Sequence, residues 1–529
     1  MRTFSIVTLG CKVNQYESDQ IATLLRARGL EQVDAKGDLR IVNTCSVTIQ
    51  AAGKSRQMTR RATRSATQPV SSRIPLTVLS NNAGEASDFF HESIDPSVGS
   101  SSFVQGTLSA ACVKPRTIVT GCWATSDRES AEKIPGVDAV LGHHDDVAAE
   151  LNRLLDGWIL KNKTQDHEGG LSVERTGYTK SQSQEHVKKN PDGFPTSLES
   201  RQSVKSGTIT LPQLGSRQTG HQRAFLKIQD GCDAHCTYCI IPQLRPTLWS
   251  KPADEAVAEA QKLVDAGHVE IVLTGIFMGA YGQPTALRRR QTQTTGKPLG
   301  ELVEALCTRV RGLKRVRLSS LEPGDLSPEL IGVLKSHPQV VPHFHLPLQS
   351  GSDRMLHRMN RQYTSRDFLK MVDGVRAAFD RPALTTDIIV GFPGETDAEF
   401  SRTREVVERA GFIHVHAFPY SPRPRTAAAR WKREFVHGPV VNDRMDELRR
   451  RAEDFSLDYR RQFVGETVEL LVEKPSAEER RLADLAGFQH GRCERYFAVH
   501  FESDRSRVGE LLKVRIERVK RERTFGIIV

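Results

Sequence analysis

The chain has 529 residues, too many for one ordinary hydrophobic core, so roughly two to four domains are expected. Its formal net charge of +11 favours a polyanionic partner, although a basic surface by itself is also compatible with a membrane surface or with simple solubility. The nine cysteines are few and odd in number, which argues against a secreted disulfide scaffold. No apolar run reaches the roughly 20 residues of a membrane helix, and the amino terminus reads as a strand rather than a signal peptide. We therefore expect a cytoplasmic protein with no membrane segment.

The first 160 residues are expected to form a parallel α/β domain. Strands are predicted at 4–9, 39–43 and 117–120, and an amphipathic helix at 17–28. Alternation of strands and helices is typical of a parallel sheet with helices on its faces.

Each of these three strands runs directly into a cysteine: Cys11, Cys45 and Cys122. A single cysteine after a strand is more often a small buried hydrophobic residue than a ligand. Three at equivalent strand ends could converge at one edge of the sheet, where α/β sheets bind their ligands. This repetition favours a metal site.

Two stretches lack the apolar periodicity of folded segments. Residues 65–114 are rich in Ser, Thr, Asn and Gly, and residues 161–219 are rich in Lys, Gln, Ser, Gly and Asp. Neither can bury enough apolar surface to offset its ordering entropy. We interpret the first as a disordered insertion and the second as a flexible linker.

A central domain at 220–463 is predicted from a repeated strand-then-helix pattern, with a charged helix at 441–463 as its last element. Successive β-α units form a whole or partial barrel, whose active site lies at the carboxyl ends of its strands. The strands are predicted at 224–228, 271–274, 315–319, 344–347, 383–390 and 414–418.

Cys232, Cys236 and Cys239 follow the first of these strands with the spacing C-x3-C-x2-C. Three thiolates can hold a four-iron cluster and leave one iron open to another ligand. Structural zinc would need a fourth ligand, commonly from a second cysteine pair, and no such pair lies nearby. The spacing therefore favours an iron-sulfur site, with zinc as the alternative.

Residues 464–529 are predicted to form a small β-barrel. The run at 513–523 is basic and, with Tyr496 and Phe497, could contact phosphates and stacked bases; an ordinary polar strand face is equally compatible with it. Strands are predicted at 467–472, 496–501, 511–516 and 523–528.

The cysteine loop, with Tyr238 before its last cysteine, resembles the radical S-adenosylmethionine (SAM) superfamily. The segments 8–18 (TLGCKVNQYES) and 42–48 (VNTCSVT) resemble the methylthiotransferases, in the bacterial branch that modifies threonylcarbamoyladenosine in tRNA. Branches acting on isopentenyladenosine or on a ribosomal protein tend toward Gly-Cys-Gln-Met-Asn and Gly-Cys-Pro-Lys-Asn, whereas residues 10–14 read Gly-Cys-Lys-Val-Asn.

This resemblance implies an enzyme with SAM and two [4Fe-4S] clusters. The radical-generating cluster would be bound by Cys232, Cys236 and Cys239, which are the catalytic residues, and an auxiliary cluster by the three amino-terminal cysteines. The product would be the 2-methylthio derivative of N6-threonylcarbamoyladenosine, at the adenosine 3′ of the anticodon. The implied partners are the tRNA anticodon stem-loop, gripped by a carboxyl-terminal TRAM domain, and an electron donor such as flavodoxin or ferredoxin.

The resemblance also implies a set of SAM-binding positions on the loops after the barrel strands. Glycines there allow close backbone approach to a ligand, and Glu322 and Gln349 could hydrogen-bond SAM; the alternative is an ordinary polar barrel mouth. The implied residues are Tyr238, Thr274, Gly275, Glu322, Gln349, Asp387 and Gly391.

The chain departs from the family pattern after the cysteine loop. Arg245 is kept, but Pro246 replaces a glycine and Trp249 an arginine, which predicts an altered loop path. Arg425 stands where glycine is usual, and an arginine-rich insertion at 288–297 is expected to be a solvated loop or an RNA contact. The alternatives are a methylthiotransferase for isopentenyladenosine or a ribosomal-protein aspartate, or a non-catalytic RNA-binding protein with structural clusters.

Overall fold

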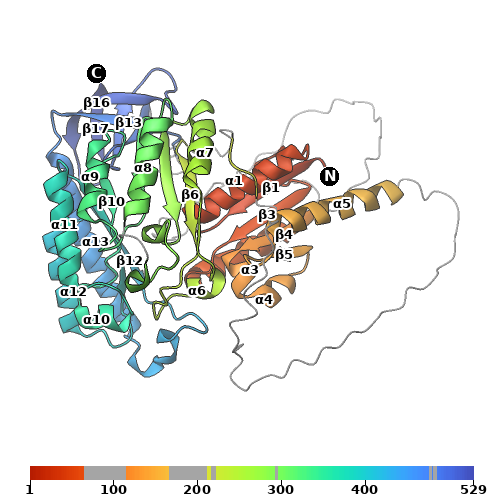
Figure 1. Cartoon of the computed structure of the whole chain (residues 1–529), viewed down its shortest axis with the longest axis horizontal. Helices are drawn as coiled ribbons and strands as arrows, with labels where there is room; N and C mark the ends of the chain where they lie inside the picture. Colours follow the sequence, from red (N-terminus) through yellow and green to blue (C-terminus); the bar gives the residue numbers. More distant parts are fainter. Residues whose placement is uncertain are drawn as a thin grey trace, which may run out of the picture.

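The computed structural model describes residues 1–64, 115–165, 211–215, 222–291, 296–475, 479, 485 and 487–529. The described chain forms an amino-terminal α/β domain, a central parallel α/β barrel and a small carboxyl-terminal β-barrel (Figure 1). The predicted insertion at 65–114 and most of the predicted linker lie outside the described residues. No helix within the described ranges combines the length and apolar character that crossing a bilayer requires.

The amino-terminal domain is a parallel sheet in the order β2-β1-β3-β4-β5, as predicted for its class. The short outer strands β2 and β5 were not predicted, because two or three residues carry no readable periodicity. The strands are β1 (Thr3–Thr8), β2 (Glu31–Gln32), β3 (Leu39–Thr44), β4 (Arg116–Gly121) and β5 (Ala139–Leu141). The helices are α1 (Lys12–Ala27), α2 (Ile49–Arg64), α3 (Cys122–Ser126), α4 (Arg128–Glu132) and α5 (Val147–Gln165).

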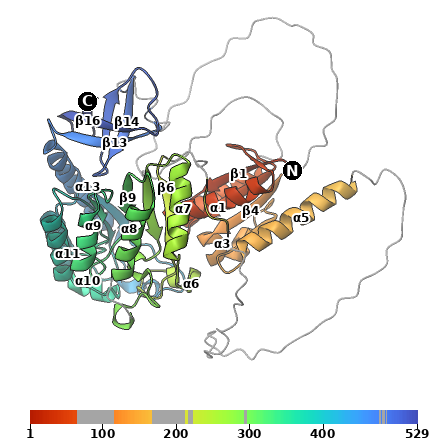
Figure 2. The same ribbon diagram turned by 45° about the horizontal axis from the view of Figure 1, so that its top comes forward.

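Helix α1 begins at Lys12, five residues before the predicted start at residue 17. Its first turns bury Val13, Asn14 and Tyr16, so this part of the helix has no exposed face to produce an amphipathic pattern. The burial arises because α1 lies between its own sheet and the central barrel (Figure 2).

The central domain is a partial barrel whose main strands run parallel in the order β6-β8-β9-β10-β11-β12. The two sheets join where Ser320 pairs with His345, and the short β7 lies antiparallel at the edge beside β6. All six predicted strands are present. The strands are β6 (Ala224–Asp230), β7 (Trp249–Ser250), β8 (Glu270–Gly275), β9 (Arg315–Leu318), β10 (His343–His345), β11 (Ala383–Val390) and β12 (His414–Pro419).

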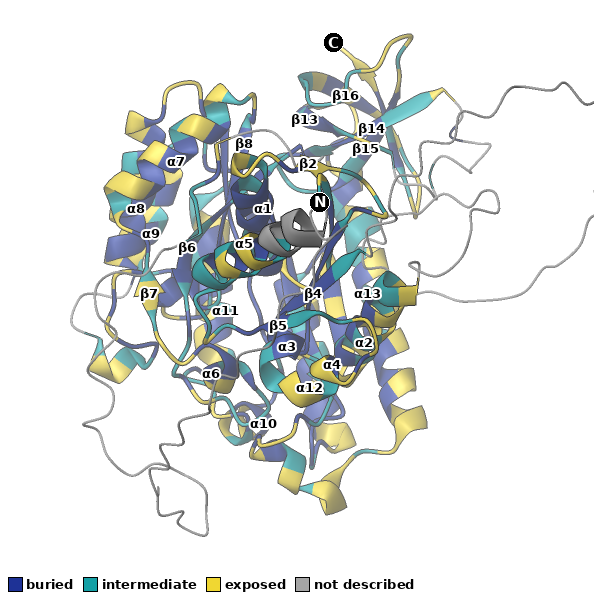
Figure 3. Cartoon of the chain, turned by 90° about the vertical axis from the view of Figure 1, so that its right-hand side faces the viewer, coloured by how far each residue is buried: buried dark blue, intermediate teal, exposed yellow. Residues whose placement is uncertain are grey.

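Helices cover the outside of this barrel, with their exposed faces turned to solvent (Figure 3). The α-helices are α6 (Ile241–Leu244), α7 (Ala253–Asp265), α8 (Lys297–Arg309), α9 (Pro328–Ser336), α10 (Asp353–Arg358), α11 (Ser365–Ala378), α12 (Asp397–Ala410) and α13 (Gly438–Arg461). The 3-10 helices are η2 (Met278–Ala280), η3 (Arg288–Arg290), η4 (Ala428–Arg430) and η5 (Lys432–Glu434).

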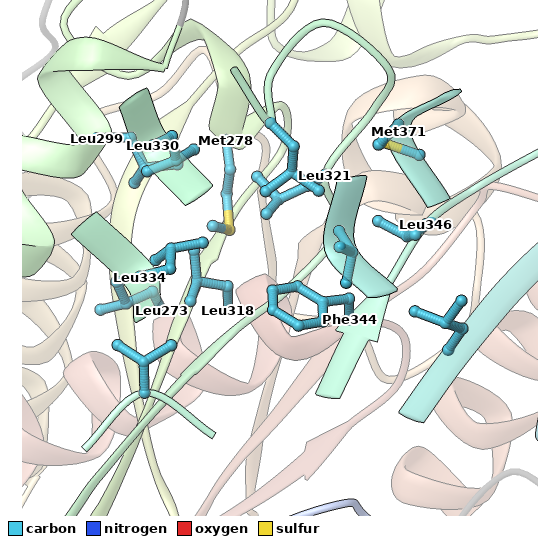
Figure 4. Packing of buried hydrophobic residues seen from close by; sticks show 14 of the residues in the cluster. Leu273, Met278, Leu299, Leu318, Leu321, Leu330, Leu334, Phe344, Leu346 and Met371 are labelled. Carbon is cyan, nitrogen blue, oxygen red and sulfur yellow. The ribbon is translucent and has the colours of Figure 1, made fainter. Parts of the chain in front are cut away.

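The barrel core lies between its strands and these helices. Leu318 and Phe344 from neighbouring strands are at most 2% exposed, and they lie with Leu330 and Leu334 of α9 (Figure 4). Because side chains alternate along a strand, the residues between these core positions face the interior of the barrel.

The carboxyl-terminal unit is a closed barrel in the order β13-β14-β15-β17-β16. Strand β14 was not predicted, because its sequence lacks clear alternation. The strand predicted at 496–501 begins only at residue 498, since Tyr496 adopts a positive φ of 74° in the preceding turn. The strands are β13 (Thr467–Glu473), β14 (Phe488–Cys493), β15 (Ala498–Glu502), β16 (Leu511–Val519) and β17 (Thr524–Ile528).

The small barrel lies against the amino ends of the central strands, far from their carboxyl ends (Figure 1). Arg315, the first residue of β9, donates to Glu469 of β13, and His343, the first of β10, stacks on Tyr496 with ring centroids 4.6 Å apart. The carboxyl ends of the central strands therefore face away from the small barrel.

Candidate active site

The loop with Cys232, Cys236 and Cys239 lies at the carboxyl end of β6, as predicted. It starts at Gly231, whose φ is 78° and where a Cβ would lie 2.0 Å from the carbonyl oxygen of Thr247. Only glycine fits this turn. The three thiols are free and partly buried.

The surroundings of these thiols fit an iron-sulfur cluster. Burial raises the pKa of Cys232 and of Cys239 to about 12, so each would need a nearby positive charge to become a thiolate. Cys232 and Cys236 pack against an apolar group that includes Phe277, and the Ala234 amide donates to Cys232 Sγ over 3.4 Å. Iron would supply the charge, and the apolar wall would exclude water.

Arg361 connects this loop to one of the implied SAM positions. Its Nη1 donates to Cys236 Sγ and to the Tyr238 hydroxyl, both over 3.3 Å, and its Nη2 forms an ion pair with Glu322. Tyr238 is further held edge-to-face against Phe392, with ring centroids 6.4 Å apart. Sequence reasoning missed Arg361, because its role depends on a residue 125 positions away along the chain.

The other implied SAM positions lie within the central strands or in the segments that follow them. Thr274 and Gly275 end β8, and a Cβ on Gly275 would lie 3.0 Å from Gln229 Cβ. Gly391 follows β11 with a φ of 72°, and a Cβ there would lie 2.4 Å from Val441. Both glycines therefore have a packing reason in the protein itself.

Gln349, in the segment after β10, lies beside Asp387 in the middle of β11. The backbone N–H of Gln349 donates to the backbone carbonyl oxygen of Asp387 over 2.8 Å, and Gln349 has a positive φ of 63°. The Asp387 carboxylate lies 3.3 Å from His345 Nε2. Burial opposes ionisation of Asp387, but hydrogen bonding and charge from His345 keep its pKa below the usual value.

The three amino-terminal cysteines meet at the carboxyl edge of their sheet. Cys11 precedes α1, Cys45 follows β3 and Cys122 opens α3. A Cβ on Gly10 would lie 3.0 Å from Cys45 Cβ, and one on Gly121 would lie 2.3 Å from an oxygen of the β3 end. The glycines before Cys11 and Cys122 thus let the strand ends approach closely.

These thiols also fit a cluster. Cys45 and Cys122 are buried free thiols, and burial raises the pKa of both; the charge of Cys11 acts in the same direction on both, and that of Cys45 does so on Cys122. Within the described residues, no three His, Cys, Asp or Glu side chains converge on one point as ligands of a single ion would. The thiols of a four-iron cluster each bind a different iron, so they need no such convergence.

An asparagine pair positions the auxiliary thiols. Asn14 Nδ2 donates to Asn43 Oδ1 over 3.2 Å and to the Thr44 carbonyl over 2.9 Å, and Asn43 donates back to the Asn14 carbonyl. Cys11 Sγ lies 3.5 Å from Asn14 Oδ1. Asn14 and Asn43 each lie within three residues of a predicted ligand, and that proximity is the signal that could have found them.

Helix α6 connects the two sets of thiols, because it directly follows the Cys239 loop and packs against Cys122. Cys122 forms a small buried cluster with Ile240 and Leu244, which directly follow the Cys239 loop. Arg245 ends α6, and its guanidinium pairs with Glu17 of α1 at 2.8 Å and with Asp230 at 2.7 Å. The retained arginine therefore connects the two domains.

The chain's departures from the family pattern have structural consequences. Trp249 lies in edge strand β7 and is 43% exposed. Arg425 has a φ of 67°, the left-handed region that favours glycine. Arg288 is not the solvated residue expected of the insertion, because it pairs with Asp325 at 2.7 Å and lies over the Phe277 ring.

Tyr496 and Phe497 were both predicted as possible contacts for stacked bases. For Phe497 this prediction is wrong, and Tyr496 has arginine neighbours within the protein. Phe497 is buried in the core of the small barrel. Tyr496 is enclosed by arginines, with Arg317 Cζ 4.9 Å and Arg492 Cζ 4.8 Å from its ring centroid. The basic face of β16 is exposed, and its contact with RNA stays a prediction.

A partial parallel barrel with a three-thiol loop after its first strand defines the class of this protein as a radical SAM enzyme. The Radical SAM superfamily profile matches residues 226–407. The profile of the uncharacterized protein family UPF0004 matches residues 3–77, and that of the TRAM domain matches residues 461–529.

Named relatives narrow this class. The threonylcarbamoyladenosine tRNA methylthiotransferase MtaB of Bacillus subtilis is 32% identical over 98% of this chain and 94% of its own length. The MtaB protein of Thermotoga maritima is 32% identical over 99% of this chain and 96% of its own length. The tRNA-2-methylthio-N(6)-dimethylallyladenosine synthase of Cereibacter sphaeroides is 30% identical over 97% and 96%. The chain therefore belongs to the radical SAM tRNA methylthiotransferase family, whose cofactors are SAM and two [4Fe-4S] clusters.

A solved structure with a similar arrangement is the radical SAM methyltransferase TsrM of Kitasatospora setae. It has 12% identity, covers 81% of this chain and 77% of its own, and gives a TM-score of 0.47.

Proposed function

We propose that this enzyme converts N6-threonylcarbamoyladenosine, at the position 3′ of the tRNA anticodon, to its 2-methylthio derivative. The observation that carries the proposal is that the two sets of three free thiols meet at α6, since Cys122 packs against Ile240 and Leu244, which directly follow Cys239. One adenosine bound near this junction could meet both a radical source and a sulfur source. The MtaB relatives support the choice of substrate.

Cys232, Cys236 and Cys239 would hold the radical-generating cluster, and Cys11, Cys45 and Cys122 the auxiliary one. The chemistry that the clusters and SAM supply when bound is removal of hydrogen from C2 of adenine, followed by delivery of sulfur and a methyl group. The chain itself orients the loop through Arg361 and Tyr238, and it excludes water with the apolar wall around the thiols.

Seven positions are proposed to contact SAM at the carboxyl ends of the strands. The Glu322 carboxylate, held by Arg361, and the Asp387 carboxylate, held by His345, are fixed acceptors there. The proposed residues are Tyr238, Thr274, Gly275, Glu322, Gln349, Asp387 and Gly391.

The tRNA is proposed to meet exposed basic side chains of the small barrel. Lys513, Arg515 and Arg518 of β16 are exposed on its outer face, where they could contact phosphates. We further propose that a flavodoxin or ferredoxin supplies electrons, and that the enzyme works in the cytoplasm, where tRNA and a reducing environment coincide.

Mass spectrometry of tRNA nucleosides from a strain lacking this protein tests the proposed function. We expect 2-methylthio-N6-threonylcarbamoyladenosine to disappear and its unmethylthiolated precursor to accumulate. Loss of the dimethylallyl product instead would assign the enzyme to the other group of relatives. Unchanged nucleosides, together with no deoxyadenosine from SAM in the reduced purified protein, would indicate a non-catalytic RNA-binding protein.

A further inference from the structure

Lys12 reaches from the amino-terminal domain into the interior of the central barrel. It directly follows Cys11 and is the first residue of α1, and its Nζ donates to Ser319 Oγ over 3.4 Å. Ser319 follows β9, in which Val316 and Leu318 pack outward in the core, so alternation turns Ser319 to the interior. Lys12 therefore places a positive charge between the auxiliary thiols and the barrel interior.

Neighbouring cations have carboxylate partners, whereas Lys12 has none among the described residues. Arg317 Nε lies 2.8 Å from Glu270, and Arg223 lies 2.9 Å from Glu473. In the part of the chain that the structure describes, no Asp or Glu lies within ion-pair distance of Lys12 Nζ. A cation in the first turn of a helix is also disfavoured by the helix dipole, so the charge does not stabilise α1.

Asp387 is a carboxylate that could pair with Lys12, but it pairs with His345 instead. It lies within electrostatic range of Lys12, but its Oδ2 pairs with His345 Nε2 at 3.3 Å. Tyr496 also lies within electrostatic range of Lys12, but its hydroxyl is hydrogen-bonded to Arg223. The positive charge of Lys12 is therefore available to an anion that enters the barrel.

A second polar group in the same region also lacks a partner. His343 is 5% exposed, and neither of its ring nitrogens has a hydrogen-bond partner among the described residues. Its ring stacks on Tyr496 and lies within electrostatic range of Lys12. A buried imidazole without a partner is costly, so a polar group that enters the barrel interior near Lys12 would find an unused hydrogen-bonding group there.

We propose that Lys12 is a specificity-determining residue that binds the carboxylate of the threonyl group on the substrate adenosine. This inference rests on the proposed function. The threonylcarbamoyl group carries a carboxylate and a hydroxyl, whereas a dimethylallyl group is an uncharged hydrocarbon. Lys12 has no carboxylate partner among the described residues, and His343 has no hydrogen-bond partner there. The threonylcarbamoyl group could pair with the Lys12 charge, whereas a dimethylallyl group would leave that charge unpaired.

The test compares wild type with Lys12→Gln, both reconstituted with iron and sulfide. Three anticodon stem-loop RNAs are compared, carrying N6-threonylcarbamoyladenosine, its methyl ester or N6-dimethylallyladenosine. Fluorescence anisotropy measures the affinity for each RNA, and mass spectrometry measures the product. We expect esterification to weaken wild-type binding about tenfold to a hundredfold, as for a hydrogen bond to a charged group. Lys12→Gln should lose a similar factor for the acid and be insensitive to esterification.

Two further variants keep the result interpretable. Lys12→Arg should retain most of the preference for the acid over the ester. Lys335→Gln, on the exposed face of α9, is the matched control and should behave as wild type. Iron content per chain shows whether each variant has folded and bound its clusters.

The outcomes separate this inference from the proposed function. Equal losses for acid and ester in Lys12→Gln, or no effect of esterification on wild type, would overturn the role of Lys12 while the enzyme still converts the threonylcarbamoyl RNA. Conversion of the dimethylallyl RNA alone would overturn the proposed function, and the role of Lys12 with it.

Discussion

Individual side chains around the thiol loop act through partners that are distant in sequence. Arg361 is the main example, because one guanidinium contacts Cys236, Tyr238 and Glu322. The cysteines could be predicted from spacing alone, since their chemistry depends on a local loop. Arg361 could not, because nothing near it in the chain indicates that α10 brings it beside the loop.

Arg361→Met should disable the cysteine loop and destabilise the barrel. It removes the closer of two arginine partners of the partly buried Glu322 carboxylate and leaves Arg288 at 3.8 Å, so the cost should stay below the roughly 3–5 kcal/mol of a fully broken buried pair. We expect deoxyadenosine formation from SAM to fall at least about tenfold and the urea midpoint to drop. The exposed Arg366→Met on α11 is the control. Wild-type SAM cleavage in Arg361→Met would show that this arginine does not position the loop.

At the scale of elements, the ends of strands place both sets of thiols. The parallel direction of the strands was predicted from the alternation of apolar strands with helices, and so was the edge at which Cys11, Cys45 and Cys122 would meet. The start of α1 was missed, because its first turns are buried against two domains. Burial of that kind depends on a neighbour that local periodicity does not reveal.

Gly121→Ala should remove the auxiliary cluster selectively. Its φ of 92° and a Cβ position 2.3 Å from Asn43 Oδ1 leave no room for a side chain, so Cys122 would be displaced. We expect iron per chain to fall by about half, with SAM cleavage retained and methylthiolation lost.

Gly157→Ala in α5 is the matched control for this prediction. Nothing lies within 4 Å of the Cβ it would add, and we expect it to be neutral or to stabilise by about 0.5–1 kcal/mol. Full iron content in Gly121→Ala would contradict the proposed auxiliary site.

For the whole molecule, the central barrel is held from two sides. Arg245 pairs with Glu17 of α1, and together with Lys227 it keeps the pKa of Glu17 below its usual value despite the cost of burial. At the amino ends of the strands, Tyr496 of the small barrel inserts among arginines. These contacts join residues far apart in sequence, and the sequence alone gave no sign of them.

Tyr496 should make the stability of this contact depend on pH. Burial opposes its ionisation, but Arg223, Arg492 and Lys12 lower its pKa to about 7, against about 10 in an unfolded chain. Its contribution is therefore absent below about pH 7, grows as pH rises, and is complete only above about pH 10. We expect stabilisation on the order of 1–3 kcal/mol between about pH 6 and pH 9.

Unfolding by urea across this range would measure that effect, with tyrosinate absorbance as an independent readout. Tyr496→Phe should lose the pH-dependent part of the stability. Tyr420→Phe should keep it, because burial raises the pKa of Tyr420 to about 12. Identical pH profiles for wild type and Tyr496→Phe would refute the ionisation of this phenol.

The six proposed cysteine ligands, the proposed succession of domains and the class of chemistry were all predicted from the chain, because cysteine spacing and strand-helix alternation are local properties. Tertiary structure alone decided what surrounds those ligands. It placed Cys122 against the helix that follows Cys239, Arg361 beside Cys236, and Lys12 in the barrel, where no carboxylate of the described ranges pairs with it. Such contacts depend on how three domains pack, and packing between distant segments leaves no periodic trace in either segment.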